Sequence, residues 1–235
     1  MRQKKFSYRL LCIAVLLAVI LSALWLDHSS QTRIACVGDS ITYGATIKDK
    51  SHDSYPAQLG SLLGRKYTVK NFGASGYTLQ ESCDRPYTSH KRYKKSLDFK
   101  PDVVLIMLGT NDTKERFGAS AACIALGLKR LIAKAASTFD AWRTGRPNIL
   151  VVTPKSIDKR YEATKVGKTM GMGCAEKSEG LAQEFEEMAS LMGCHYLDAN
   201  TVVTEQNHYD FMHLTKGGHQ ELADALTEVV SSLFI

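Results

Sequence analysis

Ser40 lies where a short apolar segment, residues 34–37, ends at Gly38-Asp39. An apolar segment of this length that is bounded by turn-forming residues is typical of a buried strand. Ligands bind at the carboxyl ends of the strands in an open α/β sheet, so we expect Ser40 at the lip of a crevice. A serine hydroxyl placed there is a candidate nucleophile, provided that the chain also supplies a base and donors for an oxyanion.

Asp210 and His213 are the best candidates for the rest of such a site. They are three residues apart in a polar segment after the last expected strand, so in a turn the carboxylate can bond one imidazole nitrogen. The other nitrogen is then free to take a serine proton, as in a catalytic triad. Two other histidines fit less well, because His195 lies in an expected strand, where a packed core histidine is more common, and His90 belongs to a basic segment.

Gly73 and Asn111 each follow an expected strand, as Ser40 does. Taken singly, a glycine or an asparagine at such a place is an ordinary turn or cap residue. In a parallel sheet, however, every strand has its carboxyl end at the same edge. We therefore expect Ser40, Gly73 and Asn111 to converge on one crevice.

A metal site is the alternative interpretation of the clustered acidic and imidazole side chains. These are His208, Asp210, His213 and His219. The chain has no His-Glu-x-x-His spacing, and a metal site would leave Ser40 and Asn111 without a role. We therefore expect acyl transfer with no metal and no organic cofactor.

Strands alternate with helices along the chain, and no hairpin signal joins two strands. The expected strands are residues 33–37, 67–72, 102–108, 148–153 and 194–198, and the expected helices are residues 54–64, 119–137, 176–192 and 214–234. This order indicates right-handed βαβ units. We predict a three-layer α/β/α sandwich with a five-stranded parallel sheet.

Two segments lie outside this regular pattern, and their positions make them candidates for substrate specificity. Residues 83–98 are basic, with interleaved tyrosines, which suits either a solvated, partly helical excursion or a rim that attracts anionic substrates or membrane headgroups. Residues 155–173 carry several charges and three glycines, so we expect a long loop there.

Residues 1–30 are expected to lie outside the fold, which leaves residues 31–235 as a single domain. A basic head precedes an apolar run at residues 10–26 that only Ser22 interrupts. Such a segment is either a secretory signal peptide or an uncleaved membrane anchor, and the positive-inside rule then places the domain outside the cytoplasm, periplasmic or secreted. Part of the net charge of +6 belongs to this head, so the remainder is too mild to indicate nucleic-acid binding.

Five of the six cysteines lie in the expected domain. Cys36 and Cys123 fall in an expected strand and helix, where they read as small buried hydrophobic residues. Cys83, Cys174 and Cys194 are nearer to loops, and an exported chain could pair two of them. No Cys-x-x-Cys is present, so neither a structural zinc site nor a thioredoxin-like motif is indicated.

Four ordered blocks of the sequence together resemble the SGNH/GDSL hydrolases. They are Gly-Asp-Ser-Ile-Thr at 38–42, Asn-Phe-Gly-Ala-Ser-Gly at 71–76, Gly-Thr-Asn-Asp at 109–112 and Asp-Phe-Met-His-Leu at 210–214. Each block alone is a loose motif, but all four in order from about residue 33 onward are specific. The resemblance implies the flavodoxin-like fold of that family.

The same resemblance implies a role for each matched residue. Ser40 would be the nucleophile and His213 the base that Asp210 orients. The oxyanion hole would consist of the backbone N–H groups of Ser40 and Gly73 and the side-chain amide of Asn111. We expect the two other aspartates of the motifs, Asp39 and Asp112, to hold loops and not to act in catalysis.

The substrate is less closely defined. The segments Gly-Asp-Ser-Ile-Thr-Tyr-Gly and Ser-Tyr-Pro-Ala-Gln-Leu are similar to exported bacterial carbohydrate O-acetylesterases, including sialate-type ones. Export of the chain, and the absence of a long apolar segment that could hold an acyl chain, are consistent with a small acyl group on a glycan. A lysophospholipase or thioesterase-type acylhydrolase and a membrane-linked O-acetyltransferase are the alternatives, and intact motif blocks make a non-catalytic binding module the least suitable.

Overall fold

The computed structural model describes residues 13–20, 22, 31–136 and 148–233 of the 235-residue chain. The predicted signal peptide or anchor at residues 1–30 lies largely outside these residues. Within the described part of the chain, no helix has the length and apolar character needed to cross a membrane.

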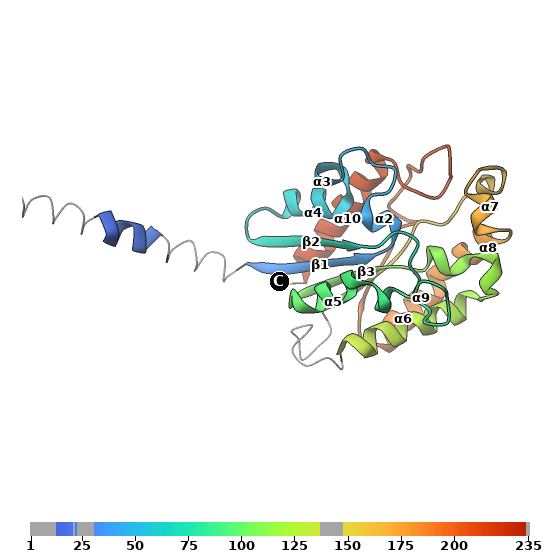
Figure 1. Cartoon of the computed structure of the whole chain (residues 1–235), viewed down its shortest axis with the longest axis horizontal. Coiled ribbons are helices and arrows are strands. Elements are labelled where there is room, and N and C mark those ends of the chain that lie inside the picture. The colour runs from blue at the N-terminus through green and yellow to red at the C-terminus, as the bar shows by residue number, and fades with distance from the viewer. Residues whose placement is uncertain (1–12, 21, 23–30, 137–147, 234–235) are drawn as a thin grey trace, which may run out of the picture.

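A five-stranded parallel sheet forms the centre of the domain, as predicted (Figure 1). Its strands are β1 (Thr32–Gly38), β2 (Tyr67–Gly73), β3 (Val103–Met107), β4 (Ile149–Thr153) and β5 (His195–Asp198). They lie in the order β2-β1-β3-β4-β5, and every neighbouring pair is parallel. The chain thus reverses its direction of winding next to β1, the position at which open α/β sheets form a binding crevice.

Helices cover both faces of the sheet (Figure 1). The longer ones are α4 (Tyr55–Leu63), α5 (Lys91–Asp98), α6 (Ala121–Ala136), α9 (Leu181–Leu191) and α10 (Lys216–Ser232). Successive side chains of β1 point to opposite faces, so that Ile34 packs with α4 and α10 while Ala35 packs with α6 and α9. The central strands are therefore apolar throughout, because both of their faces are buried.

Short helices surround the carboxyl edge of the sheet. The α-helical ones are α2 (Ser40–Tyr43), α3 (Lys50–Asp53), α7 (Gly167–Met170) and α8 (Cys174–Glu179), and the 3₁₀ ones are η1 (Tyr87–Ser89), η2 (Thr110–Thr113), η3 (Glu115–Phe117) and η4 (Lys159–Ala163). The basic segment 83–98 is partly helical, as expected, because it contains η1 and α5.

Two predictions about these elements are wrong. Residues 155–173 are not one long loop, because η4 and α7 wrap around the buried ring of Tyr161. Residues 176–192 are not one helix either. The helix begins earlier, at Cys174, and divides into α8 and α9 at Gly180, whose helical φ and ψ let the apolar periodicity continue across the break.

The cysteines and one histidine also differ from expectation. Cys36, Cys83, Cys123, Cys174 and Cys194 are free thiols, so the structure does not form the pairing considered for an exported chain. Cys123 is exposed on α6 and not buried. His195 is exposed and not packed in the core, because β5 is an edge strand whose first residue faces solvent.

His219 joins the first turn of α10 to the start of α4. Its side chain is fully buried, its Nδ1 accepts a hydrogen bond of 3.1 Å from the Tyr55 N–H, and its ring stacks on that of Tyr55. Nε2 has no hydrogen-bond partner among the residues that the structure describes. Burial, reinforced by the nearby His213, lowers the pKa of His219 from its ordinary value of 6.5 to about 4.

This lowered pKa predicts a pH-dependent loss of stability. Between pH 6.5 and 4 the unfolded chain binds a proton at His219 that the folded chain does not bind, so His219 reduces the free energy of unfolding as the pH falls. The reduction from pH 8 to pH 5 is roughly 2 kcal/mol. We expect His219→Gln, whose amide oxygen can still accept from Tyr55, to lose this part of the pH dependence in urea titrations.

The matched control is His195→Gln at an exposed position. It should follow the wild-type curve at every pH. A His219→Gln protein whose free energy of unfolding parallels that of the wild type from pH 8 to pH 5 would contradict the assignment.

Candidate active site

Ser40 is the first residue of α2, directly beyond the end of β1. The preceding residue, Asp39, caps this short helix, because its Oδ1 accepts a hydrogen bond of 2.9 Å from the Ile41 N–H. Gly38 allows the tight turn, since a Cβ at that position would lie 1.9 Å from Thr42 Oγ1. The Ser40 side chain is thereby held at the carboxyl edge of the sheet, at a residue that is 8% exposed.

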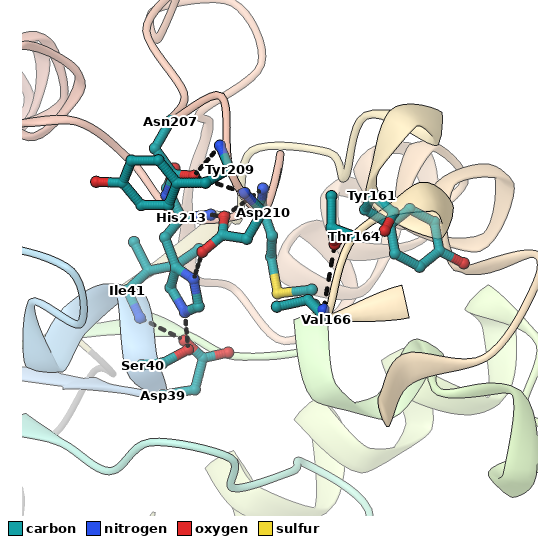
Figure 2. Close-up of polar contacts among 11 residues, drawn as sticks. Asp39, Ser40, Ile41, Tyr161, Thr164, Val166, Asn207, Tyr209, Asp210 and His213 are labelled. Atoms are coloured by element: carbon teal, nitrogen blue, oxygen red, sulfur yellow. Dashed lines mark hydrogen bonds and ion pairs between the residues drawn. The ribbon is translucent and has the colours of Figure 1, made fainter. Parts of the chain in front are cut away.

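His213 and Asp210 reach Ser40 from the loop that precedes α10 (Figure 2). His213 Nε2 lies 2.8 Å from Ser40 Oγ, and His213 Nδ1 lies 2.8 Å from Asp210 Oδ2. An ionised carboxylate can only accept, so Nδ1 carries the imidazole proton and Nε2 is free to accept from the serine hydroxyl. This arrangement can remove the proton of Ser40 as an electrophile is attacked.

The Asp210 carboxylate is held ionised by its hydrogen bonds. Burial acts to raise its pKa, but the bond from the His213 side chain and those from the His213 and Met212 N–H groups outweigh burial, so the pKa lies below its ordinary value. The carboxylate is therefore charged when His213 becomes protonated, and it can stabilise the imidazolium.

Asn207, which was not among the expected site residues, holds the loop that carries both residues (Figure 2). Its Oδ1 accepts from the N–H groups of Tyr209 and Asp210, and its Nδ2 and backbone N–H both donate to the His213 carbonyl. An asparagine three residues before the Asp is a typical Asx-turn signal. The loop is also anchored by Met212, which is buried in the same apolar cluster as Tyr161.

Asp39 and Asp112 hold loops, as expected. Asp39 Oδ2 accepts from Asn111 Nδ2 at 3.3 Å, and Asp112 accepts from the N–H groups of Leu79 and Gln80 at 3.0 and 2.9 Å. Burial raises the pKa of Asp39 to about 6 and that of Asp112 to about 7. The bond to Asp39 also fixes the orientation of the Asn111 amide.

A cavity of about 470 Å³ opens beside Ser40. Its wall contains three of the predicted site residues: Ser40, Asn111 and His213. The rest of the lining comes from the loops after β1, β2 and β3 and from the segment that contains α7: Ala45, Ser75, Gly76, Asp84, Arg85, Lys114, Arg116, Val166, Thr169 and Met170.

Gly73 does not line this cavity, so its prediction as an oxyanion donor is wrong. Its N–H donates to Asn71 Oδ1 at 2.9 Å, and Asn71 Nδ2 in turn donates to the Thr42 carbonyl. A Cβ at Gly73 would lie 2.2 Å from the Tyr43 nitrogen. Gly73 is thus needed for close packing of β2 on α2, whereas Gly76, three residues later in the same motif, lines the cavity.

The histidines considered for a metal site do not gather. His219 is buried against Tyr55, and the ring of His208 lies against Phe211. Across residues 13–20, 22, 31–136 and 148–233, no three His, Cys, Asp or Glu side chains are placed to hold a metal ion together.

The sequence matches the family model of the GDSL-like lipase/acylhydrolase family over residues 36–221. An 82-residue stretch is 51% identical to an acetylxylan esterase of Xylanibacter ruminicola. That stretch covers 35% of this chain and 17% of the length of the acetylxylan esterase.

Solved structures share the fold over most of their length. The native aryl esterase of M. smegmatis is 28% identical, with a TM-score of 0.74, and the match covers 86% of this chain and 99% of that one. A carbohydrate acetylesterase from Sinorhizobium meliloti is 24% identical, with a TM-score of 0.72 over 86% of this chain and 100% of that chain. At 24% identity, the similarity to the Sinorhizobium meliloti structure shows a shared fold alone.

The packing role of Gly73 predicts a loss of stability on substitution. A methyl group at Gly73 must displace the backbone of α2, so we expect Gly73→Ala to lower the free energy of unfolding by about 1–3 kcal/mol or more. Chemical denaturation measures the change. Gly60→Ala is the control, because a Cβ there meets Val69 at an ordinary distance of 3.4 Å. A Gly73→Ala protein as stable as the wild type would refute the packing account.

Proposed function

Because the chain belongs to the GDSL-like lipase/acylhydrolase family, we propose that it is a serine esterase that removes small acyl groups, O-acetyl above all, from a carbohydrate. The observation that carries the proposal is the chain of two 2.8 Å hydrogen bonds from Asp210 through His213 to Ser40. It supplies a nucleophile, a base and a group that orients the base.

In the proposed reaction, Ser40 Oγ attacks the ester carbonyl carbon while His213 Nε2 takes the hydroxyl proton. The tetrahedral intermediate collapses when His213 returns that proton to the leaving alcohol oxygen, which leaves an acyl-serine. A water molecule then attacks the acyl carbon, again giving its proton to His213. Release of the carboxylic acid restores the Ser40 hydroxyl.

The proposed oxyanion donors are the Ser40 N–H, the Asn111 side-chain amide and the Gly76 N–H, which replaces Gly73. Gly76 and Asn111 line the cavity beside Ser40, which supports this assignment. Asn111 Nδ2 carries two protons, and only one of them is directed at Asp39. Each such donor is worth roughly 2.7–4 kcal/mol in the transition state.

An acetylated glycan is the proposed substrate. The stretch shared with an acetylxylan esterase supports an acetyl group on a polysaccharide. Charged side chains in the cavity wall, such as Arg85 and Lys114, suit a polar alcohol part better than a long acyl chain. We further propose, on the basic head and apolar run of residues 1–30 alone, that the enzyme acts outside the cytoplasm and that this segment attaches it to the membrane if it is not cleaved.

The acyl-length profile tests this proposal against a lysophospholipase or thioesterase. We expect kcat/KM on p-nitrophenyl esters to be highest for acetyl and to fall steeply beyond butyryl, and we expect acetate release from acetylated xylan. Ser40→Ala should abolish both activities while Ser82→Ala, at an exposed serine, keeps them. A preference for long acyl chains, or turnover by Ser40→Ala, would overturn the proposal.

A further inference from the structure

We propose that Lys114 and Arg85 form an anion-binding subsite beside Ser40, and that the preferred ester carries a carboxylate on its alcohol part. This inference rests on the proposed function and names the substrate class of the same site. Both side chains line the cavity that contains Ser40 and His213, and they come from different loops, after β3 and β2.

Lys114 is a buried cation without a direct counter-ion. The residue is 6% exposed, and among the described residues no carboxylate lies within ion-pair distance of its amine. Burial lowers its pKa, and the charge of Arg116 acts in the same direction. The ammonium lies 6.0 Å from the centre of the Phe117 ring, and with no carboxylate of the described residues paired with it in the cavity wall, it is available to an anion that arrives with the ligand.

Two carboxylates, those of Asp84 and Asp39, act on the charge of Lys114, but both form their direct contacts with other residues. Asp84 Oδ2 forms a 2.8 Å ion pair with Arg116, and Asp39 accepts from Ile41 and Asn111. Arg116 also donates to the Thr169 carbonyl at 3.2 Å, so its guanidinium is held in place. Asp84 and Arg116 therefore offset each other, and Lys114 remains as an excess positive charge.

Arg85 supplies a second positive charge at the cavity mouth. Its carbonyl accepts from the Thr78 N–H and the Thr78 hydroxyl at 2.9 and 3.0 Å, which fixes its backbone. Its guanidinium makes no ion pair or hydrogen bond with the described residues, and a Cβ on Gly76 would lie 3.4 Å from its Nη1. The guanidinium thus lies next to the turn that carries the proposed oxyanion donor, with its donors free for a ligand.

This arrangement favours a ligand whose carboxylate is separated from the scissile ester by a few bonds. The ester carbonyl would lie at Ser40, and the carboxylate would accept from Lys114 and from the planar fork of Arg85, which matches a carboxylate. In this binding mode the acyl group itself is uncharged, because the carboxylate belongs to the alcohol part of the ester. Charge recognition is therefore expected in the alcohol part.

The test uses two acetyl esters that differ only at C6, which is a carboxylate in a mono-acetylated methyl glucuronoside and a hydroxymethyl group in the methyl glucoside acetylated at the same position. We expect the wild type to prefer the glucuronoside in kcat/KM, mainly through KM, with a preference that weakens as ionic strength rises. Lys114→Met and Arg85→Gln should each reduce the preference by roughly tenfold. Lys114→Arg should restore most of it.

Lys129→Met is the matched control, because it makes the same substitution at an exposed lysine of α6 that does not line the cavity. It should leave the preference for the glucuronoside unchanged. A wild type without preference for the glucuronoside, or Lys114→Met and Arg85→Gln variants that lose activity equally on both esters, would overturn the subsite and leave these cations a structural role.

A binding measurement separates this inference from the proposed function. Calorimetry with unacetylated methyl glucuronoside and methyl glucoside requires no turnover. We expect binding of the glucuronoside alone, and loss of that binding in Lys114→Met. Binding without hydrolysis of any acetyl ester would reject the esterase and keep the subsite, whereas hydrolysis without selective binding would reject the subsite and keep the esterase.

Discussion

The hydrogen bond of 2.8 Å between His213 Nε2 and Ser40 Oγ joins residues that are 173 positions apart, and the proposed chemistry depends on it. One side of this contact is fixed by β1, which lies between β2 and β3 and ends two residues before Ser40. The other side is fixed by Asn207, whose side-chain and backbone hydrogen bonds shape the loop that carries His213. The parallel sheet brings the two loops to the same edge. The side-chain caps of these loops, Asp39 and Asn207, then place Ser40 and His213 within hydrogen-bonding distance of each other.

Buried polar groups are concentrated at this same edge of the sheet, where they are expected to reduce stability. Burial raises the pKa values of Asp39 and Asp112 to about 6 and 7, even though each carboxylate accepts two hydrogen bonds. Lys114 adds a largely buried cation that forms no ion pair with a carboxylate of the described residues. The apolar clusters on the two faces of the sheet offset such costs. Asp39 positions the Asn111 amide at this edge, and Asp112 anchors the loop after β2 through the Leu79 and Gln80 N–H groups.

The sequence was sufficient for features that depend on local pattern. Apolar segments ending in turn residues located the five strands, and the spacing of Asp210 and His213 indicated that they could meet in a turn. The errors concern features that tertiary contacts decide. Gly73 and Gly76 belong to the same motif, and only the packing of β2 on α2 shows which of them faces the cavity. The helices of residues 155–173 pack on an apolar cluster that contains Tyr161 and also Met212 from a distant loop.

Covalent labelling shows whether His213 activates Ser40 as the nucleophile. A fluorophosphonate ester reacts with an activated serine and leaves a stable adduct that mass spectrometry of peptides can locate. We expect one adduct per chain, on Ser40, that is absent in Ser40→Ala and forms much more slowly in His213→Gln. An adduct on another residue that abolishes esterase activity, or unchanged labelling of the Ser40→Ala protein, would contradict this role of Ser40.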